Sequence, residues 1–174
     1  VSLIIAAHNE AGVIATKLAN SRALDYPPEL LEIVVASDGS DDGTAALAAA
    51  CGGPNLTVLE LPRQGKNRTL NSAVAAARNE LLVFSDADSA LEPQALRRLA
   101  AAFADPAVGG VAGDYRYRRG SSVGGETAYW SLDRALKGWQ SRAGSITSAT
   151  GQLYAIRRAL FQPVPDGVTD DFFI

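Results

Sequence analysis

The chain has 174 residues, an ordinary apolar fraction and a formal net charge of −3, which together indicate one globular domain. The slight negative charge argues against a protein that binds nucleic acid through a broad basic surface. The single cysteine, Cys51, excludes an intramolecular disulfide and fits a reducing compartment. No apolar run reaches the ~18 residues of a membrane span, but the chain starts inside an apolar run, lacks methionine and ends on Ile174. We therefore expect a fragment cut at both ends.

The first half alternates β-branched runs with alanine-rich segments of helical spacing. Strands are predicted at residues 1–7, 31–37, 56–61 and 81–85. Strands that alternate with helices predict a parallel sheet with right-handed crossovers. Because the strands read as nearly continuous apolar runs, we expect helices to cover both faces of the sheet.

The helices between these strands have recognisable faces and ends. Ile14, Leu18 and Ser21 share one face of the first predicted helix. Residues 41–50 predict another helix, with Ser40 as its N-cap. A further helix carries Leu96, Leu99, Ala100 and Phe103 on one face, with Pro93 in its first turn and Pro106 just beyond its end.

The second half is less regular. Residues 108–119 predict a strand or hairpin arm, residues 152–156 a short strand, and Arg157-Arg158 the start of a short helix. Residues 126–143 predict a longer helix whose apolar stripe fits packing against the core. The tryptophans and basic residues of that helix would also fit a membrane interface: Trp130, Trp139, Arg134, Lys137 and Arg142.

Polar clusters follow three of the predicted strands at the point where each strand ends. They are His8-Asn9-Glu10, the run 37–44, and Asp86-Ala87-Asp88. In open parallel sheets, ligands bind outside the carboxyl ends of the strands. We therefore expect the three clusters to converge on one rim of the sheet.

The last cluster suggests a cation site. If the chain stays extended, the carboxylates of Asp86 and Asp88 point the same way and repel, and a divalent cation would relieve that repulsion. Mg²⁺ and Mn²⁺ take oxygen ligands, often one or two carboxylates plus phosphates of a substrate. The alternative is a pair of solvated loop acids, because this short pattern is common.

Other candidate groups have both a functional and a structural interpretation. Asp38, at a strand end, could accept hydrogen bonds from a base or ribose, although turn chemistry also explains this segment. Lys66 and Arg68 could steady an anionic ligand or form a solvated positive face. His8 is the only histidine, and we see no zinc site, no phosphate-binding P-loop and no dinucleotide-binding glycine motif.

Two acids near the end of the chain, Asp170 and Asp171, stand between apolar residues. A carboxylate against a partly buried wall has a raised pKa and is a better general base. The alternative is a helix N-terminus capped by Thr169 or Asp170.

Taken in order, these motifs resemble family 2 of the inverting glycosyltransferases, which have the GT-A fold, a Rossmann-like, mostly parallel α/β sheet with helices on both faces. The resemblance covers nearly the whole chain. Two departures are Ala6, where many relatives have proline, and Asp170, where the family usually has glutamate. The matching segments are Val1 to Ile5 with His8-Asn9-Glu10, Ser37-Asp38-Gly39-Ser40, Gly65-Lys66 with Leu70-Asn71, Asp86-Ala87-Asp88, Thr150-Gly151-Gln152 with Ala155 and Arg157-Arg158, and Thr169-Asp170-Asp171.

The resemblance implies a role for each matching residue. Asp38 would bind the nucleotide base, Asp86 would approach the ribose or a metal-bound water, and Asp88 would hold the metal on the diphosphate, with Asp86 as a second candidate ligand. Asp171 would be the catalytic base, with Asp170 beside it. The nucleotide-sugar pocket would also include Ala7, Asn9, Glu10, Gly39, Lys66 and Ala87, and the acceptor side would include Thr150, Gly151 and Gln152.

It also implies one catalytic domain over residues 1–174, with a nucleotide-sugar half at 1–105 and an acceptor half at 106–174. The donor would be a UDP-sugar, the cofactor Mg²⁺ or Mn²⁺, and the acceptor a glycan or a lipid-linked glycan in polysaccharide synthesis. We expect a soluble fragment of a protein that works at the cytoplasmic face of the cell membrane. Two alternatives are a fragment that binds the donor without turnover, and a sugar nucleotidyltransferase. The second is disfavoured because the loop after the first strand lacks a glycine-rich, basic sequence.

Overall fold

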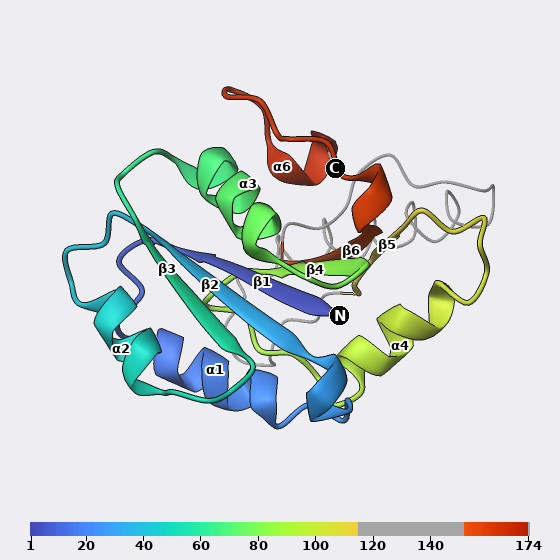
Figure 1. Cartoon of the computed structure of the whole chain (residues 1–174), viewed down its shortest axis with the longest axis horizontal. Helices are drawn as coiled ribbons and strands as arrows, with labels where there is room; N and C mark the ends of the chain where they lie inside the picture. Colours follow the sequence, from blue (N-terminus) through green and yellow to red (C-terminus); the bar gives the residue numbers. More distant parts are fainter. Residues whose placement is uncertain (115–151, 174) are drawn as a thin grey trace, which may run out of the picture.

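The computed structural model describes residues 1–114 and 152–173, with the backbone alone for residues 171 and 172. Its centre is a six-stranded sheet with the order β3-β2-β1-β4-β6-β5 (Figure 1). The strands are β1 (Ser2–Ala7), β2 (Glu32–Asp38), β3 (Leu56–Leu61), β4 (Leu81–Ser85), β5 (Gly110–Ala112) and β6 (Leu153–Arg157).

Helices cover both faces of the sheet. On one face lie α1 (Ile14–Arg22), α2 (Thr44–Ala50) and α4 (Ala95–Ala102), and on the other lie α3 (Lys66–Ala76) and the short α6 (Asp170–Phe173) (Figure 1). Two 3₁₀ turns, η1 (Pro28–Leu30) and η2 (Arg158–Leu160), flank β2 and β6. The predicted mixed α/β layering is confirmed.

The sheet is parallel through its first four strands and antiparallel at one edge. β1 pairs in parallel with β2 and β4, and β2 pairs in parallel with β3. β6 runs antiparallel to both β4 and β5. The four parallel strands therefore present their carboxyl ends at one rim, and the antiparallel β6 brings its first residues to that same rim beside the end of β4.

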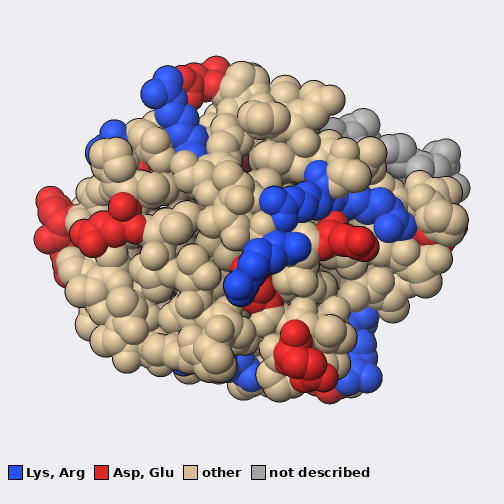
Figure 2. Space-filling view, in the orientation of Figure 1, with Lys and Arg blue, Asp and Glu red and all other residues tan. Residues whose placement is uncertain are grey.

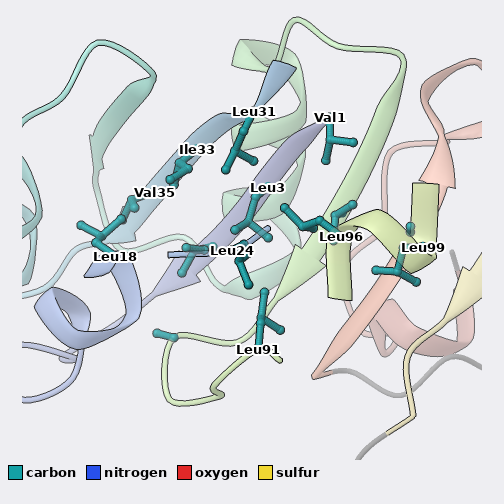
Figure 3. Close-up of a cluster of buried hydrophobic side chains, with 14 of the residues drawn as sticks. Val1, Leu3, Leu18, Leu24, Leu31, Ile33, Val35, Leu91, Leu96 and Leu99 are labelled. Carbon is teal, nitrogen blue, oxygen red and sulfur yellow. The ribbon is translucent and has the colours of Figure 1, made fainter. Parts of the chain in front are cut away.

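The core forms because alternate residues of each strand enter opposite faces of the sheet. Leu3, Ile33 and Val35 pack with Leu18 of α1 and with Leu96 of α4 (Figure 3). Residues one position along the same strands pack against α3 on the other face: Ile4 and Val34 join Leu70 and Val74. Burial of each such side chain contributes roughly 1.5–3 kcal/mol. The packing on both faces fixes the positions of the strands, and therefore of the loops at their ends, relative to one another.

Two predicted helix ends are wrong by a few residues. α2 begins at Thr44 rather than at 41, and Ser40 is not its cap. The N-cap residue is Gly43, and the Asp42 carboxylate before it accepts the amide N–H of Thr44, the first helical residue, at 2.9 Å. Pro93 likewise precedes the residue before α4 and is not in its first turn. The predicted helix 126–143 and residues 115–119 of the predicted hairpin arm lie outside the described residues.

Acidic and basic side chains are intermixed on the face of the molecule shown in Figure 2, and uncharged residues cover most of it. Ion pairs in the described part of the chain include Arg78 with Glu32 and Arg97 with Asp25.

Candidate active site

The loops after β1 and β2 are joined by hydrogen bonds at the rim. The Asn9 amide donates to the Ser40 hydroxyl at 3.1 Å, and the Asp41 amide donates back to Asn9 Oδ1 at 3.1 Å. Asn9 adopts a left-handed backbone conformation (φ 57°), which asparagine tolerates better than most residues. The Glu10 amide donates to Thr44 Oγ1 at 2.8 Å. The structure thus brings the first two predicted clusters together.

Asp38, at the end of β2, is only 3% exposed and holds the loop between β3 and α3. Its carboxylate accepts the amide N–H groups of Gln64 (2.7 Å) and Gly65 (3.1 Å) and pairs with the guanidinium of Arg63. Burial alone would raise the pKa of Asp38, but these hydrogen bonds and the positive charge of Arg63 hold it below its ordinary value. In this structure Asp38 anchors a neighbouring loop of the rim.

Gly39 permits that close approach. Its φ is +59°, and a Cβ placed there would lie 2.6 Å from the amide nitrogen of Arg63. Only glycine accommodates both the backbone conformation and the neighbouring chain. The glycine of the Asp-Gly pair therefore has a packing role at the rim as well as a turn role.

Lys66, the first residue of α3, connects two acidic segments that are far apart in the sequence. Its Nζ lies 3.5 Å from Asp86 Oδ1 and 3.3 Å from Asp170 Oδ1. Burial lowers the pKa of Lys66, but the two carboxylates outweigh burial and raise it. The other oxygen of Asp170 accepts the Tyr154 hydroxyl at 3.0 Å, and Asp170 is 7% exposed. The C-terminal acids are thereby tied to the end of β4.

Asp86 and Asp88 lie in a turn that follows β4, so the expected extended alternation does not describe them. Ala87 is buried between them, Asp86 is half-buried and Asp88 is exposed. Burial, together with the charge of Asp88, raises the pKa of Asp86, while Lys66 opposes the rise. Burial raises the pKa of Glu10, and the charges of Asp88, Asp42 and Asp86 raise it further. Glu10, after β1, therefore interacts electrostatically with Asp86 and Asp88, after β4.

These groups fit a hard divalent cation that takes part of its shell from a ligand. Within the described ranges 1–114 and 152–173, no three Asp, Glu, His or Cys side chains form a complete metal site. Asp88 has an exposed carboxylate, and no described residue donates a hydrogen bond to it or forms an ion pair with it. Two carboxylates suffice for Mg²⁺ or Mn²⁺ when phosphate oxygens and water complete the coordination.

The acceptor side is only partly visible. Thr150 and Gly151 lie outside the described residues, and Gln152 is half-buried with its carbonyl accepting the Ser85 hydroxyl at 3.2 Å. Asp171 is placed in α6 by its backbone, beside the tethered Asp170. The predicted base therefore lies in α6 next to Asp170, and its catalytic role stays a prediction.

Residues 2–164 match the family model described as glycosyl transferase family 2. The chain belongs to glycosyltransferase family 2. The rim of this glycosyltransferase domain combines the predicted motifs after β1, β2 and β4 with Lys66 and Asp170. The sequence-based prediction of the family and of its fold is confirmed.

Similar proteins give the domain a wider setting. It is 28% identical over 185 residues to poly-β-1,6-N-acetyl-D-glucosamine synthase of Staphylococcus epidermidis, covering 100% of this chain and 44% of that protein. The solved structure of the mannosyltransferase PcManGT from Pyrobaculum calidifontis, in complex with GDP-Man and Mn²⁺, has a TM-score of 0.86 at 30% identity over 98% of this chain and 49% of that chain. TarS of Staphylococcus aureus in complex with UDP-GlcNAc has a TM-score of 0.60 at 28% identity, covering 70% of this chain and 36% of that one. The chain thus spans less than half the length of these relatives.

The described part of this family 2 domain contains no helix that is both long and apolar enough to cross a membrane.

Sequence reasoning missed one residue beneath the rim, Lys17 of α1. It is 3% exposed, and its Nζ donates to Ser85 Oγ (2.6 Å), Ser89 O (2.7 Å) and Ser89 Oγ (3.0 Å). Burial lowers the pKa of Lys17 to about 8, and the charges of Asp86 and Asp88 oppose that effect. The available signal was its position, because residues 14, 17, 18 and 21 share the buried helix face of this glycosyltransferase domain.

Proposed function

We propose that this domain transfers a sugar, with inversion at the anomeric carbon, from a nucleoside diphosphate sugar to an acceptor hydroxyl. The observation that carries the proposal is the position of Lys66, which pairs with Asp86 on one side and with Asp170 on the other. Lys66 thereby joins Asp86, which follows β4, to Asp170, the first residue of α6, at the rim where the parallel strands end. That rim is where α/β sheets bind nucleotides.

On the donor side, Asp88 and Asp86 are the residues that would hold a divalent cation on the diphosphate. The cation, when bound, neutralises the departing diphosphate as a Lewis acid. Asp38, through Arg63 and the amides of Gln64 and Gly65, would keep the loop that lines the nucleotide pocket in place. The presence of GDP-Man with Mn²⁺ in PcManGT and of UDP-GlcNAc in TarS supports this type of donor.

On the acceptor side, Asp171 would take the proton of the attacking hydroxyl. As the hydroxyl oxygen forms a bond to the anomeric carbon, the bond from that carbon to the diphosphate oxygen breaks. Both oxygens of Asp170 are already engaged, one by Lys66 and the other by Tyr154. This favours Asp171 as the base and assigns Asp170 to holding the segment in position.

For the whole protein, we propose a glycan or lipid-linked glycan acceptor and a site of action at the cytoplasmic face of the cell membrane. The name of the poly-β-1,6-N-acetyl-D-glucosamine synthase relative supports a glycan product. Because this chain covers 44% of that relative, acceptor and location are questions for the full-length protein.

Donor binding tests the proposal directly. Calorimetric titration with UDP-GlcNAc and with GDP-mannose, each with Mn²⁺, Mg²⁺ or EDTA, should show binding of one donor that depends on the metal. Asp88→Ala should weaken donor binding at least ~10-fold, because it removes the exposed carboxylate. Glu29→Ala, an exposed acid at the opposite end of the sheet, should bind the donor as the wild type does.

Donor binding that is unchanged by EDTA and by Asp88→Ala would contradict the metal assignment. In the full-length protein, Asp171→Asn should abolish sugar transfer while donor affinity is retained, and full transfer activity would contradict the base assignment. Donor binding by the present chain with no hydrolysis or transfer would favour the binding-only alternative for this part of the protein.

A further inference from the structure

The ammonium group of Lys17 is buried under the turn that carries Asp86 and Asp88. Its three N–H donors have three acceptors, which are Ser85 Oγ, Ser89 O and Ser89 Oγ. Ser85 is the last residue of β4, and Ser89 directly follows Asp88. Lys17 therefore binds the residue directly before Asp86, which is Ser85, and the residue directly after Asp88, which is Ser89.

The hydroxyls of Ser85 and Ser89 also form hydrogen bonds to other residues of the rim. Ser89 Oγ donates to the carbonyl of Asp86 at 2.9 Å, and the two serine hydroxyls lie 3.0 Å apart. Ser85 Oγ donates to the carbonyl of Gln152, the residue that precedes β6. The Lys17 ammonium thus contacts the residues at both ends of the acidic turn and, through Ser85, the residue that precedes β6.

Simple packing does not explain a lysine at this position. The acceptors of Lys17 are all neutral, and no carboxylate in the described part of the chain lies within ion-pair distance of its Nζ. Removing an ammonium group from water without such a partner is unfavourable, and an apolar side chain would fill a buried helix face without that penalty. The nearby negative charges that favour the ammonium are those of Asp86 and Asp88. The positive charge of Lys17 is therefore best explained by the acidic turn that lies over it.

We propose that Lys17 is a positioning residue of the donor site, which holds the turn 85–89 so that Asp86 and Asp88 present their carboxylates to the cation and the diphosphate. This inference rests on the proposed function. Lys17 touches neither the donor nor the cation in this scheme. It acts through Ser85, Ser89 and the backbone of the turn.

The test compares Lys17→Met with Ser21→Ala. Methionine keeps the length and most of the volume of lysine but removes the charge and the three donors. Ser21 lies one helical turn further along α1, is equally buried, and donates its hydroxyl to the Lys17 carbonyl without contact to the turn. Both variants should melt at a lower temperature than the wild type. Only Lys17→Met should weaken the binding of Mn²⁺ with nucleoside diphosphate, by about tenfold, in calorimetric titration.

A second readout needs no ligand. In the metal-free protein, amide hydrogen exchange in peptides covering residues 86–89 should be faster in Lys17→Met than in the wild type, and unchanged in Ser21→Ala. This measurement tests the role of Lys17 separately from the proposed function of the domain. If the wild type binds no metal–nucleotide pair, the proposed function fails, while faster exchange in Lys17→Met would still show that Lys17 orders the turn.

Ser89→Ala covers the case in which Lys17→Met does not fold. It removes one acceptor of Lys17 from a partly exposed position, and we expect the same changes, with a loss of Mn²⁺ affinity smaller than the about tenfold loss in Lys17→Met. Wild-type Mn²⁺ affinity and wild-type exchange at residues 86–89, in Lys17→Met or in a Ser89→Ala variant that replaces it, would reduce Lys17 to a packing residue and overturn the proposal.

Discussion

Strand β2 carries an acid at each end, and the two acids have similar burial but different surroundings. Glu32 begins the strand and Asp38 ends it, and each is 3% exposed. Hydrogen bonds and a neighbouring arginine lower the pKa of both carboxyls against the opposing effect of burial. Burial and a perturbed pKa alone therefore do not distinguish a functional end of the sheet from a structural one.

The partners of the two acids make the distinction. Glu32 accepts the Ser2 hydroxyl at 2.6 Å and the amide and Nε of Arg78 at 2.8 Å each, which closes the amino end of the sheet. A depression of about 790 Å³ lies beside this network, with Glu32 and Arg78 in its lining. At the carboxyl end, the exposed Asp88 and the doubly paired Lys66 lie at the rim. The depression at the amino end is lined by equal numbers of arginines and glutamates, so it offers no net charge to a ligand. The rim at the carboxyl end brings a lysine and several aspartates together and is the better candidate for a nucleotide site.

The largest expected effect is that of Asp38→Asn, which should reduce both stability and donor binding. The amide cannot pair with Arg63 as a carboxylate does and presents N–H groups to the donors of Gln64 and Gly65. We expect the free energy of unfolding to fall by about 3 kcal/mol and donor affinity to fall at least ~10-fold, because the loop before α3 is released. Urea denaturation and calorimetric titration measure the two effects. A stability loss with unchanged donor affinity would make the two ends of β2 equivalent.

Glu32→Gln should affect stability alone. It removes the charge that the Arg78 guanidinium and the Ser2 hydroxyl stabilise, and hydrogen bonds to charged groups contribute about 2 kcal/mol each. Since Arg78 is largely exposed, we expect a total loss of about 2 kcal/mol in urea denaturation. Donor affinity should stay at the wild-type value, and a decrease would show that the amino end of β2 influences the rim.

The stability contribution of Glu32 should also depend on pH, and this effect is smaller than that of the substitution itself. The folded-state pKa of Glu32 lies below its ordinary value of 4.5, so its contribution is complete above that value and is lost as pH falls through the lower, folded pKa. The stability difference between wild type and Glu32→Gln should therefore shrink as urea titrations move from about pH 7 to about pH 3.5. The difference for the exposed Glu29→Gln should stay near zero throughout. A constant difference for Glu32→Gln would mean that its carboxylate charge is not the stabilising feature.

Much of the fold follows from local patterns. Continuous apolar runs located the first four strands to within one residue, and the polar runs after them correctly predicted the shared rim. The direction of β6 was beyond such reasoning, because an apolar run reads the same in parallel and antiparallel pairing. The N-cap at Ser40 was wrong because the helix begins after Gly43, and the side chains of Ser40 and Asp42 accept amide N–H groups of the loop after β1, which no local pattern reveals.

The two buried charges that escaped prediction, one beneath the rim and one at the amino end of the sheet, depend on partners far away in the sequence. Lys17 and Glu32 look like ordinary surface charges until the fold buries them, since their partners lie 68 and 46 residues away at Ser85 and Arg78. Lys66 was predicted to steady an anionic ligand, but its position between Asp86 and Asp170 depends on the packing of α3 against the segment before α6. Long-range ion pairs of this kind have no local sequence signal.

That packing gives the smallest predicted effect. Asn71 on α3 accepts the Val164 amide at 2.9 Å and donates to the Val164 carbonyl at 3.0 Å, so one side chain fixes the start of the segment that leads to Asp170. Asn71→Ala should lower the free energy of unfolding by about 1 kcal/mol, less than either acid of β2. Ser72→Ala is the comparison variant on the same helix. The Ser72 hydroxyl donates to the Arg68 carbonyl at 2.9 Å and accepts the Gln64 side chain at 3.3 Å, without contact to Val164, and its loss should change stability less.

The kinetic effect of Asn71→Ala separates the two sides of the rim. The turn of Asp86 and Asp88 is held from β4 and α1, whereas Asp170 is held from α3 and β6, and Lys66 of α3 pairs with both Asp86 and Asp170. In the full-length protein, Asn71→Ala should therefore lower kcat for sugar transfer several-fold and leave donor affinity within about twofold of the wild type. An equal fall in both would mean that the C-terminal acids shape the donor pocket through Lys66. The rim would then act as a single unit rather than as a donor side and an acceptor side that share one lysine.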